Sequence, residues 1–172
     1  MNLDKRAQVR AYLDEHEIPY EIHEHPSVPT VEEALPYWNA IDAAHCKNLF
    51  FRNHKGNKHY LVILDHRRQL NIRDLEQRLK QGKISFASPR RMERYLGVGG
   101  GSVSAFGIIN DREKHVHLFI DDRLNNVERI SFHPNENTAT FVISFASFIK
   151  FLESSGNSYE FIALYDDDPQ GI

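Results

Sequence analysis

The sequence of 172 residues contains a single cysteine, Cys46. One cysteine excludes an internal disulfide and a site in which several thiolates bind a metal. Long apolar runs are also missing, and the charged residues among positions 1–6 do not lead into a hydrophobic segment. Neither a secretory signal nor a membrane span is expected there, so we expect a cytoplasmic protein that does not bind membranes.

Neither sign of charge dominates the chain as a whole. Lys and Arg number 21 and Asp and Glu 24, which gives a net charge of −3 with histidine neutral. This balance argues against a protein that coats nucleic acid without discrimination. Between residues 67 and 94, however, nine basic residues stand against three acidic ones, a local charge of +6. Such a segment suits recognition of a polyanion at one place, and a solvated helix face explains it equally well.

Length and composition favour one packed domain. Hydrophobic residues make up 41% of the chain and charged residues 26%, which is typical of soluble globular proteins. No internal repeat or low-complexity linker divides the sequence. We expect one domain over residues 1–165, followed by a frayed acidic tail over residues 166–172.

The pattern of apolar and polar residues predicts helices and strands without regular alternation. Helices are expected over residues 4–17, after a Thr30-x-x-Glu33 capping box, after Asn71, after Ser88-Pro89 and after Ser144, with Gly82 and Gly97 ending the third and fourth. Strands are expected over residues 20–23, 49–52, 60–64, 106–109, 116–120, 129–132, 140–143 and 161–164. This order predicts an α+β fold, with a mixed, mostly antiparallel sheet or a partly closed barrel surrounded by helices.

Residues 97–101 hold four glycines in five positions. Glycine lets a ligand approach the backbone closely, so exposed amide hydrogens are the expected contribution of this loop. Ser102 stands where a dinucleotide-binding motif needs glycine, and the loop lacks the lysine of a phosphate-binding P-loop. Taken alone, a tight structural turn is the simpler interpretation.

Residues 45–48, with the sequence His-Cys-Lys-Asn, directly precede a predicted strand and place an amine and an amide at its entrance. Lys47 could bind a phosphate as a flexible point charge, or it could be an ordinary surface lysine. Cys46 could act as a nucleophile if a neighbouring base lowered its pKa. Spacing alone does not decide between these roles.

The ten histidines raise the question of a metal site. His23 and His25, like His115 and His117, are two residues apart and would share a face of a strand. Two ligands do not make a site, and neither a cysteine pair nor a glutamate-bearing zinc helix accompanies them. We therefore expect no metal and no other cofactor. His133 differs from these because it ends a predicted strand and can reach a cleft.

Four segments taken together, in their order and spacing, resemble the YbaK-like aminoacyl-tRNA deacylases. The segments are His45-x-Lys47-Asn48-Leu49-Phe50, Leu96-Gly97-Val98-x-x-Gly101-Ser102-Val103, Phe106-Gly107-Ile108-Ile109-Asn110-Asp111 and Phe132-His133-Pro134-Asn135-x-x-x-Thr138-Ala139-Thr140. Within that family the chain looks most like the free-standing prolyl-tRNA editing proteins, and the resemblance covers about residues 30–164. It implies a trans-editing hydrolase for mischarged tRNA, with alanyl-tRNA(Pro) as the expected substrate.

The resemblance also implies roles for individual residues. Lys47 and Asn48 would hold the terminal adenosine and its phosphate, while backbone amides of the glycine loop would face the aminoacyl carbonyl. The substrate's own ribose hydroxyl would help to activate the attacking water, so no triad or metal is required. The expected catalytic residues are Lys47, Gly99, Gly100, Gly101 and His133, and the residues expected to bind the substrate are His45, Asn48, Ser102, Asp121 and Asn135. From the basic segment of residues 67–94, rather than from the resemblance, Arg67, Arg68, Arg90 and Arg91 are expected to bind the tRNA.

Gly100 and Ala105 depart from the family's pattern, because proline is common at both positions. Without proline the loop has more conformational freedom, and mobile amide donors stabilise an oxyanion less well. The alternative function is therefore a non-catalytic tRNA-binding or regulatory module with a degenerate glycine loop. A domain that binds a small molecule or nucleotide is a third interpretation. The expected partners are mischarged tRNA, by resemblance tRNA(Pro), and prolyl-tRNA synthetase in a transient contact.

Overall fold

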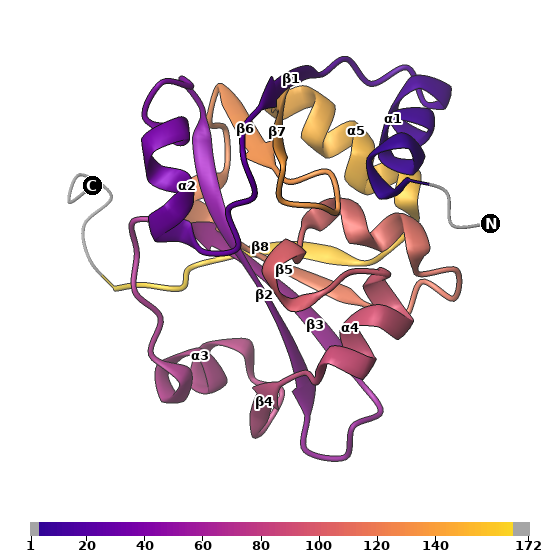
Figure 1. The fold of residues 1–172 in the computed structure, drawn as a ribbon. Coiled ribbons are helices and arrows are strands. Elements are labelled where there is room, and N and C mark those ends of the chain that lie inside the picture. Colours follow the sequence, from indigo (N-terminus) through magenta and orange to yellow (C-terminus); the bar gives the residue numbers. More distant parts are fainter. Residues whose placement is uncertain (1–3, 167–172) are drawn as a thin grey trace.

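The computed structural model describes residues 4–166, which fold around an eight-stranded sheet with helices packed against it (Figure 1). This architecture confirms the predicted α+β class. The helices are α1 (Lys5–Glu15), α2 (Val31–Trp38), α3 (Ile72–Leu79), α4 (Pro89–Leu96) and α5 (Phe145–Ser155), with short 3-10 turns η1 (Gly100–Ser102), η2 (Ala105–Asn110) and η3 (Asp122–Leu124). The strands are β1 (Glu21–Glu24), β2 (Ala44–Asn53), β3 (His59–Asp65), β4 (Ile84–Phe86), β5 (His117–Asp121), β6 (Arg129–Phe132), β7 (Ala139–Ser144) and β8 (Tyr159–Ile162).

Strand β2 joins two parts of the sheet, whose order is β1-β7-β6-β2-β3-β5-β8 with β4 paired to β2. Its first residues pair in parallel with β6, but only at Ala44↔Ile130 and His45↔Ser131. From Cys46 to Arg52 it then pairs antiparallel with β3, and its far end also pairs with β4. Beyond His45, β2 and β6 are therefore no longer paired, which leaves room between them.

Side chains that the sequence marks as helix caps act as caps in the structure. Thr30, Asn71, Ser88 and Ser144 each accept a hydrogen bond from a backbone N–H in the first turn of their helix. Gly97 ends α4 with φ +67°, a left-handed conformation that glycine adopts without strain. The predicted starts of α2, α3, α4 and α5 are thus confirmed.

The predicted strand over residues 106–109 is wrong, because this segment forms the 3-10 turn η2. Residues 105–108 are buried, and the Cα of Gly107 packs so closely on α4 that an added Cβ would lie 2.9 Å from the Cβ of Leu96. An apolar run that is buried on every side looks the same in sequence whether it is a strand or a helical turn. Tertiary packing against α4 therefore decides the conformation here.

Several predicted boundaries also move. Residues 45–48 lie inside β2 rather than before it, and β4 was not predicted. Helix α3 ends at Lys80, whose φ is +56°, and not at Gly82. The last strand lies two residues earlier than expected. Of the predicted tail, Asp166 forms an ion pair with Arg78 at 2.6 Å, and residues 167–172 lie outside the described part of the chain.

The core consists of two large apolar clusters, and the alternating side chains of β2 contribute to both. Phe50 belongs to the cluster that includes Leu96 of α4, whereas Phe51 belongs to the cluster that includes Leu75 and Leu79 of α3. Successive side chains of a strand point to opposite faces, so α3 and α4 cover opposite faces of this part of the sheet. Among residues 4–166 we find no helix long and apolar enough to cross a membrane.

A buried histidine at the start of β3 connects this sheet to α4. Arg91 Nη1 donates a hydrogen bond to His59 Nε2 at 2.9 Å, so Nδ1 of His59 carries the proton and donates to His115 Nε2, also at 2.9 Å. The ring also packs against Tyr95. Burial, together with the charges of His115 and Arg91, lowers the pKa of His59 to about 4.

We expect the free energy of unfolding to fall as the pH drops from about 6.5 to about 4. In that window the unfolded chain takes up a proton at His59 that the folded chain does not, and protons bound only by the unfolded state favour unfolding. Denaturant unfolding at pH 7, 6 and 5 should show this slope, and His59→Gln should reduce it. The same substitution at the exposed His54 is the control. An unchanged slope in His59→Gln would contradict the assignment.

Candidate functional site

A cavity of about 180 Å³ lies beside the point where β2 and β6 part. Its lining comes from residues 28–31 and Trp38 around α2, residues 46–49 of β2, residues 100, 101 and 103 of the glycine loop, and His133 after β6. Sites that enclose drug-sized ligands measure about 300–1,000 Å³. The cavity can therefore enclose only a small part of a substrate, such as an aminoacyl group.

The register of β2 and β6 explains why Lys47 and His133 meet in this cavity. The last pair between the two parallel strands is His45↔Ser131. Lys47 lies two positions beyond His45, and His133 lies two positions beyond Ser131. Residues two apart on a strand share a face, and the strands run in the same direction. The divergence of the strands therefore delivers both side chains to the same space.

His45 fastens the strands at the last pair. The Ser131 hydroxyl donates to His45 Nδ1 at 2.5 Å, and Nε2 donates to the carbonyl oxygens of Trp38 and Ile41 at 3.1 and 3.0 Å. Its ring stacks on Trp38 with the centroids 4.9 Å apart. Burial lowers the pKa of His45, so the ring stays neutral. His45 lies behind the lining residues, where it connects β2, β6 and the end of α2.

Lys47 and Asn48 present donors to the cavity from the next two positions of β2. Lys47 Nζ donates to the carbonyl oxygen of Arg68 at 2.9 Å, which orients the ammonium and leaves two further N–H groups. Asn48 Oδ1 accepts from the backbone N–H of Ala105 at 3.1 Å, and its Nδ2 makes no hydrogen bond within the described chain. The amide of Asn48 therefore still has both of its donors.

Two residues of the glycine loop, Gly100 and Gly101, line the cavity. Gly100 and Gly101 begin the 3-10 turn η1, which Ser102 N–H closes by donating to the carbonyl oxygen of Gly99 at 3.1 Å. The first N–H groups of such a turn have no acceptor within it. At Gly101 an added Cβ would lie 3.2 and 3.3 Å from Cβ and Cα of Pro29, whereas at Gly100 it would meet nothing within 4 Å.

His133 contributes an acceptor. Its Nδ1 lies 2.9 Å from the carbonyl oxygen of Ala139, and because a carbonyl only accepts, Nδ1 carries the proton of the neutral ring. Nε2 is then unprotonated and makes no hydrogen bond with the described residues. Burial lowers the pKa of His133, which favours this neutral form.

Cys46 also lines the cavity, but its thiol is not an activated nucleophile. The side chain is buried, and this burial raises the pKa of the thiol well above its ordinary value. A nucleophilic cysteine needs a neighbouring base or cation that lowers its pKa. Here the thiol remains protonated and acts as an apolar wall.

The other expected substrate-binding residues lie outside the lining. Asp121 is fully buried, caps η3 through the backbone N–H of Arg123 at 3.1 Å, and has a pKa raised by burial. Asn135 adopts a left-handed conformation with φ +61° and donates to the carbonyl oxygen of Phe106 at 3.3 Å. Ser102, and also Gly99, which was expected to be catalytic, belong to the glycine loop but not to the cavity wall. These residues shape the surroundings of the site.

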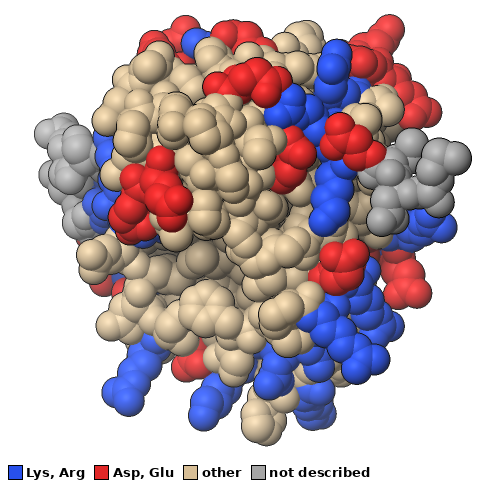
Figure 2. Space-filling model, viewed as in Figure 1, with Lys and Arg blue, Asp and Glu red and all other residues tan. Residues whose placement is uncertain are grey.

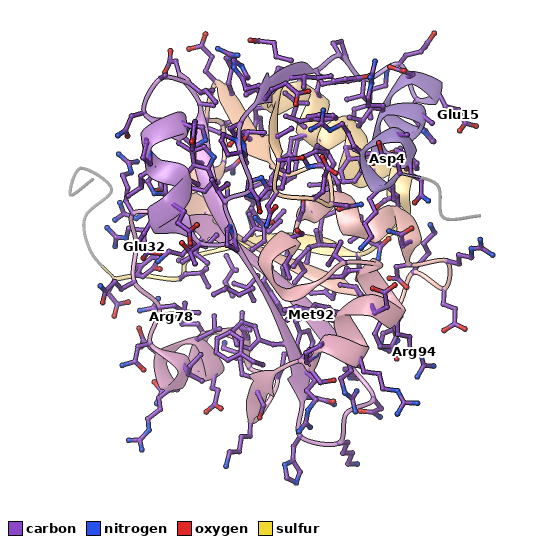
Figure 3. The ribbon with its side chains drawn as sticks, viewed as in Figure 1. Asp4, Glu15, Glu32, Arg78, Met92 and Arg94 are labelled. Carbon is purple, nitrogen blue, oxygen red and sulfur yellow. The ribbon has the colours of Figure 1, made fainter. Side chains whose placement is uncertain are left out.

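The basic segment of residues 67–94 is spread over the surface. Arg67 forms a bidentate ion pair with Asp65 at 2.8 and 3.0 Å, and the guanidinium of Arg68 lies over the ring of Tyr165 at 4.2 Å. Arg90 and Arg91 lie on α4, where Arg91 also donates to the carbonyl oxygen of Gly56. Figure 3 shows Arg78 of α3 and Arg94 of α4 on opposite sides of the lower half. The segment therefore does not form one compact patch.

Part of the cavity wall could not be recognised from the sequence. Val28, Val31, Leu49 and Val103 look like ordinary core residues, although here they line a cavity. Trp38 could have been noticed as a candidate for the cavity wall, because it is the only tryptophan of the chain. Its ring nitrogen donates to Thr140 Oγ1 at 3.3 Å.

Residues 25–151 match the aminoacyl-tRNA editing domain family. The matched range includes every residue of the cavity lining. The chain belongs to this family. Editing domains of this kind remove an amino acid from a tRNA by hydrolysing the ester that joins them, so the predicted aminoacyl-tRNA deacylase is confirmed.

Individual relatives agree with this assignment. This chain is 36% identical to the prolyl-tRNA editing protein ProX of Acetoanaerobium sticklandii, and the match covers 95% of this chain and 100% of the relative. It is 35% identical to a prolyl-tRNA synthetase associated domain-containing protein of Xenopus laevis over 90% of this chain and 94% of the relative. The resemblance found in the sequence is thereby confirmed.

A solved structure shares the fold. A crystal structure described as that of a candidate trans-editing enzyme for prolyl-tRNA synthetase superposes with a TM-score of 0.70. The alignment covers 95% of this chain and 99% of the other at 17% sequence identity.

Two adjacent glycines of the editing domain offer a matched test of the loop. Gly101→Ala should lower deacylation roughly tenfold to a hundredfold, since its Cβ would press on the backbone of Pro29 and displace the amides. Gly100→Ala keeps the N–H, meets no neighbour and should leave the rate within about twofold. The measurement is the single-turnover rate of deacylation by both variants. Equal rates would show that close contact with Pro29 does not position the loop.

Proposed function

We propose that this chain deacylates alanyl-tRNA(Pro) in trans and spares prolyl-tRNA(Pro). In this proposal the mischarged tRNA arrives free or through a transient contact with prolyl-tRNA synthetase. The similarity to ProX, whose name describes prolyl-tRNA editing, supports the choice of tRNA. The observation that carries the proposal is one small cavity whose lining includes Lys47, Asn48, the first two residues of a 3-10 turn and His133.

Hydrolysis of an aminoacyl ester develops negative charge on the carbonyl oxygen. The amides of Gly100 and Gly101 are the proposed donors to this oxyanion, because fixed donors contribute most where charge appears in the transition state. Lys47 and Asn48 hold the terminal adenosine and its phosphate from the opposite wall. The ammonium of Lys47 is already oriented by the carbonyl of Arg68, so less side-chain freedom is lost on binding.

The attacking water needs an acceptor for its hydrogen bond. His133 Nε2 is unprotonated and lines the cavity, so we assign it the role of holding this water or the substrate's ribose hydroxyl. The hydroxyl of the ribose takes part in activating the water. No protein nucleophile is needed, which agrees with the protonated state of Cys46.

The size of the cavity supports alanine as the amino acid removed. A synthetase site built for proline cannot strongly exclude the smaller alanine, because each missing methylene changes binding by only about 1–3 kcal/mol. A second site that admits only small side chains corrects the error. Valines, Leu49 and Trp38 belong to the apolar part of the wall, and these bulky side chains limit the space available.

The direct test is deacylation of alanyl-tRNA(Pro), prolyl-tRNA(Pro) and seryl-tRNA by the wild type and Lys47→Ala. We expect release of alanine, little release of proline, and a rate about a hundredfold or more lower for Lys47→Ala, since a charged contact to the substrate is lost. Lys55→Ala, in the exposed turn between β2 and β3, is the control for loss of a lysine. Absence of release above the spontaneous rate from every substrate would favour a non-catalytic tRNA-binding module instead.

The pH dependence of the reaction tests the role of His133. Its lowered pKa keeps the ring neutral at and somewhat below pH 6.5, so the rate should hold there and fall only at lower pH, where protonation removes the acceptor. His133→Ala should lower the rate across the whole range and abolish this acid limb. The measurement is the single-turnover rate between pH 5 and 8, corrected for spontaneous hydrolysis. If the rate of His133→Ala still falls at low pH, a group other than His133 causes that fall.

A further inference from the structure

Phe86 on β4 is the most exposed large apolar side chain in residues 4–166, at 56%. Its ring is nevertheless held in place, because it stacks on Phe51 with the centroids 4.6 Å apart and the planes at 28°. Phe51 itself is fully buried. One face of the Phe86 ring is therefore supported by the core, and the other is open to solvent.

The exposed ring lies along the same face of β2 as part of the cavity. Phe86 pairs with Phe51 across the antiparallel β4–β2 ladder. Side chains two apart on a strand share a face, which places Lys47, Leu49 and Phe51 together. Lys47 and Leu49 line the cavity. At about 3.3 Å per residue, Phe51 lies about 13 Å along β2 from Lys47, a distance that a few nucleotides of a single strand cover.

Four cationic side chains come from the segments just before and just after β4. Lys80 and Lys83 precede β4, and Arg90 and Arg94 follow it on α4. All four are exposed, and within the described chain none of them forms an ion pair. Figure 2 shows Lys and Arg spaced along the lower edge of this face, over the region of α3, β4 and α4, while most Asp and Glu in the view lie higher.

We propose that Phe86 is a stacking platform for an unpaired base at the 3′ end of the tRNA, with the cations of the segments before and after β4 holding neighbouring phosphates. An aromatic ring beside basic side chains is the arrangement by which proteins bind single-stranded nucleic acid. The inference rests on the proposed function, because the aminoacyl ester in the cavity is attached to this end of the tRNA.

The side chains on and beside β4 favour RNA over a protein partner. A protein interface has an apolar core that is depleted of charged side chains, especially lysine. Here a single exposed aromatic ring lies on a strand whose flanking segments carry four exposed lysines and arginines without acidic partners in the described chain. Every base offers a flat face to stack on the ring, and the phosphates on either side of it complement the positive charge.

The test measures the affinity of Phe86 variants for uncharged tRNA(Pro). Phe86→Ala and Phe86→Leu should weaken binding roughly 5- to 100-fold, since a stacked base is lost. Phe86→Trp should bind within about twofold of the wild type, and tRNA should quench its added fluorescence, with the wild type as the blank for Trp38. Phe86→Leu keeps an apolar cover over Phe51, so it separates stacking from stability. Wild-type affinity in Phe86→Leu would overturn the proposal.

A second ligand tests whether the base must be unpaired. The probe is a blunt RNA duplex with the sequence of the acceptor stem and no single-stranded end. The wild type and Phe86→Ala should bind this duplex equally, because it offers no free base to the ring. An equal loss of affinity by Phe86→Ala for duplex and tRNA would overturn the platform, as would failure of the wild type to bind tRNA.

Binding of uncharged tRNA requires no catalysis, so the two proposals fail separately. A wild type that releases alanine but whose tRNA affinity is indifferent to Phe86 retains its editing function and loses the platform. A wild type that releases no amino acid but whose tRNA affinity depends on Phe86 loses the editing function and retains the platform.

Discussion

The site depends on one short junction, the place where parallel strands β2 and β6 stop pairing. The hydrogen bond between His45 and Ser131 lies at the last pair, and the same ring also binds two carbonyl groups at the end of α2. A buried neutral imidazole that satisfies both nitrogens costs little to bury and fixes three elements at once. The cavity opens directly beyond it, so the position of Lys47 and His133 is set by this contact and not by either residue itself.

Around that junction the protein keeps most titratable groups uncharged. Burial lowers the pKa of His45 and of His133, and it raises the pKa of Cys46. Lys47 remains as a cation at the wall. In surroundings of low polarity, a single charge and a few oriented dipoles act more strongly on a substrate than they would in water. The arrangement suits a reaction in which charge develops on the substrate.

The sequence revealed the starts of four helices and several polar residues that line the cavity, because caps and polar motifs are local signals. It could not reveal the 3-10 turn over residues 105–110, since an apolar run buried against α4 carries no distinctive period. It also placed His45 in the substrate site, whereas the structure shows this ring holding the strands behind it. Such roles depend on which strands pair, and strand pairing cannot be inferred from residues that are neighbours in the sequence. The apolar wall of the cavity was hidden for the same reason.

The buried thiol has a consequence for the durability of the site. Oxidants and alkylating agents react with the thiolate, and a thiol that is buried and held protonated reacts slowly with them. Cys46 lines the cavity beside Lys47, so its oxidation would add polar bulk to the cavity. By burying this sulfur the fold preserves the shape and polarity of the cavity under oxidising conditions.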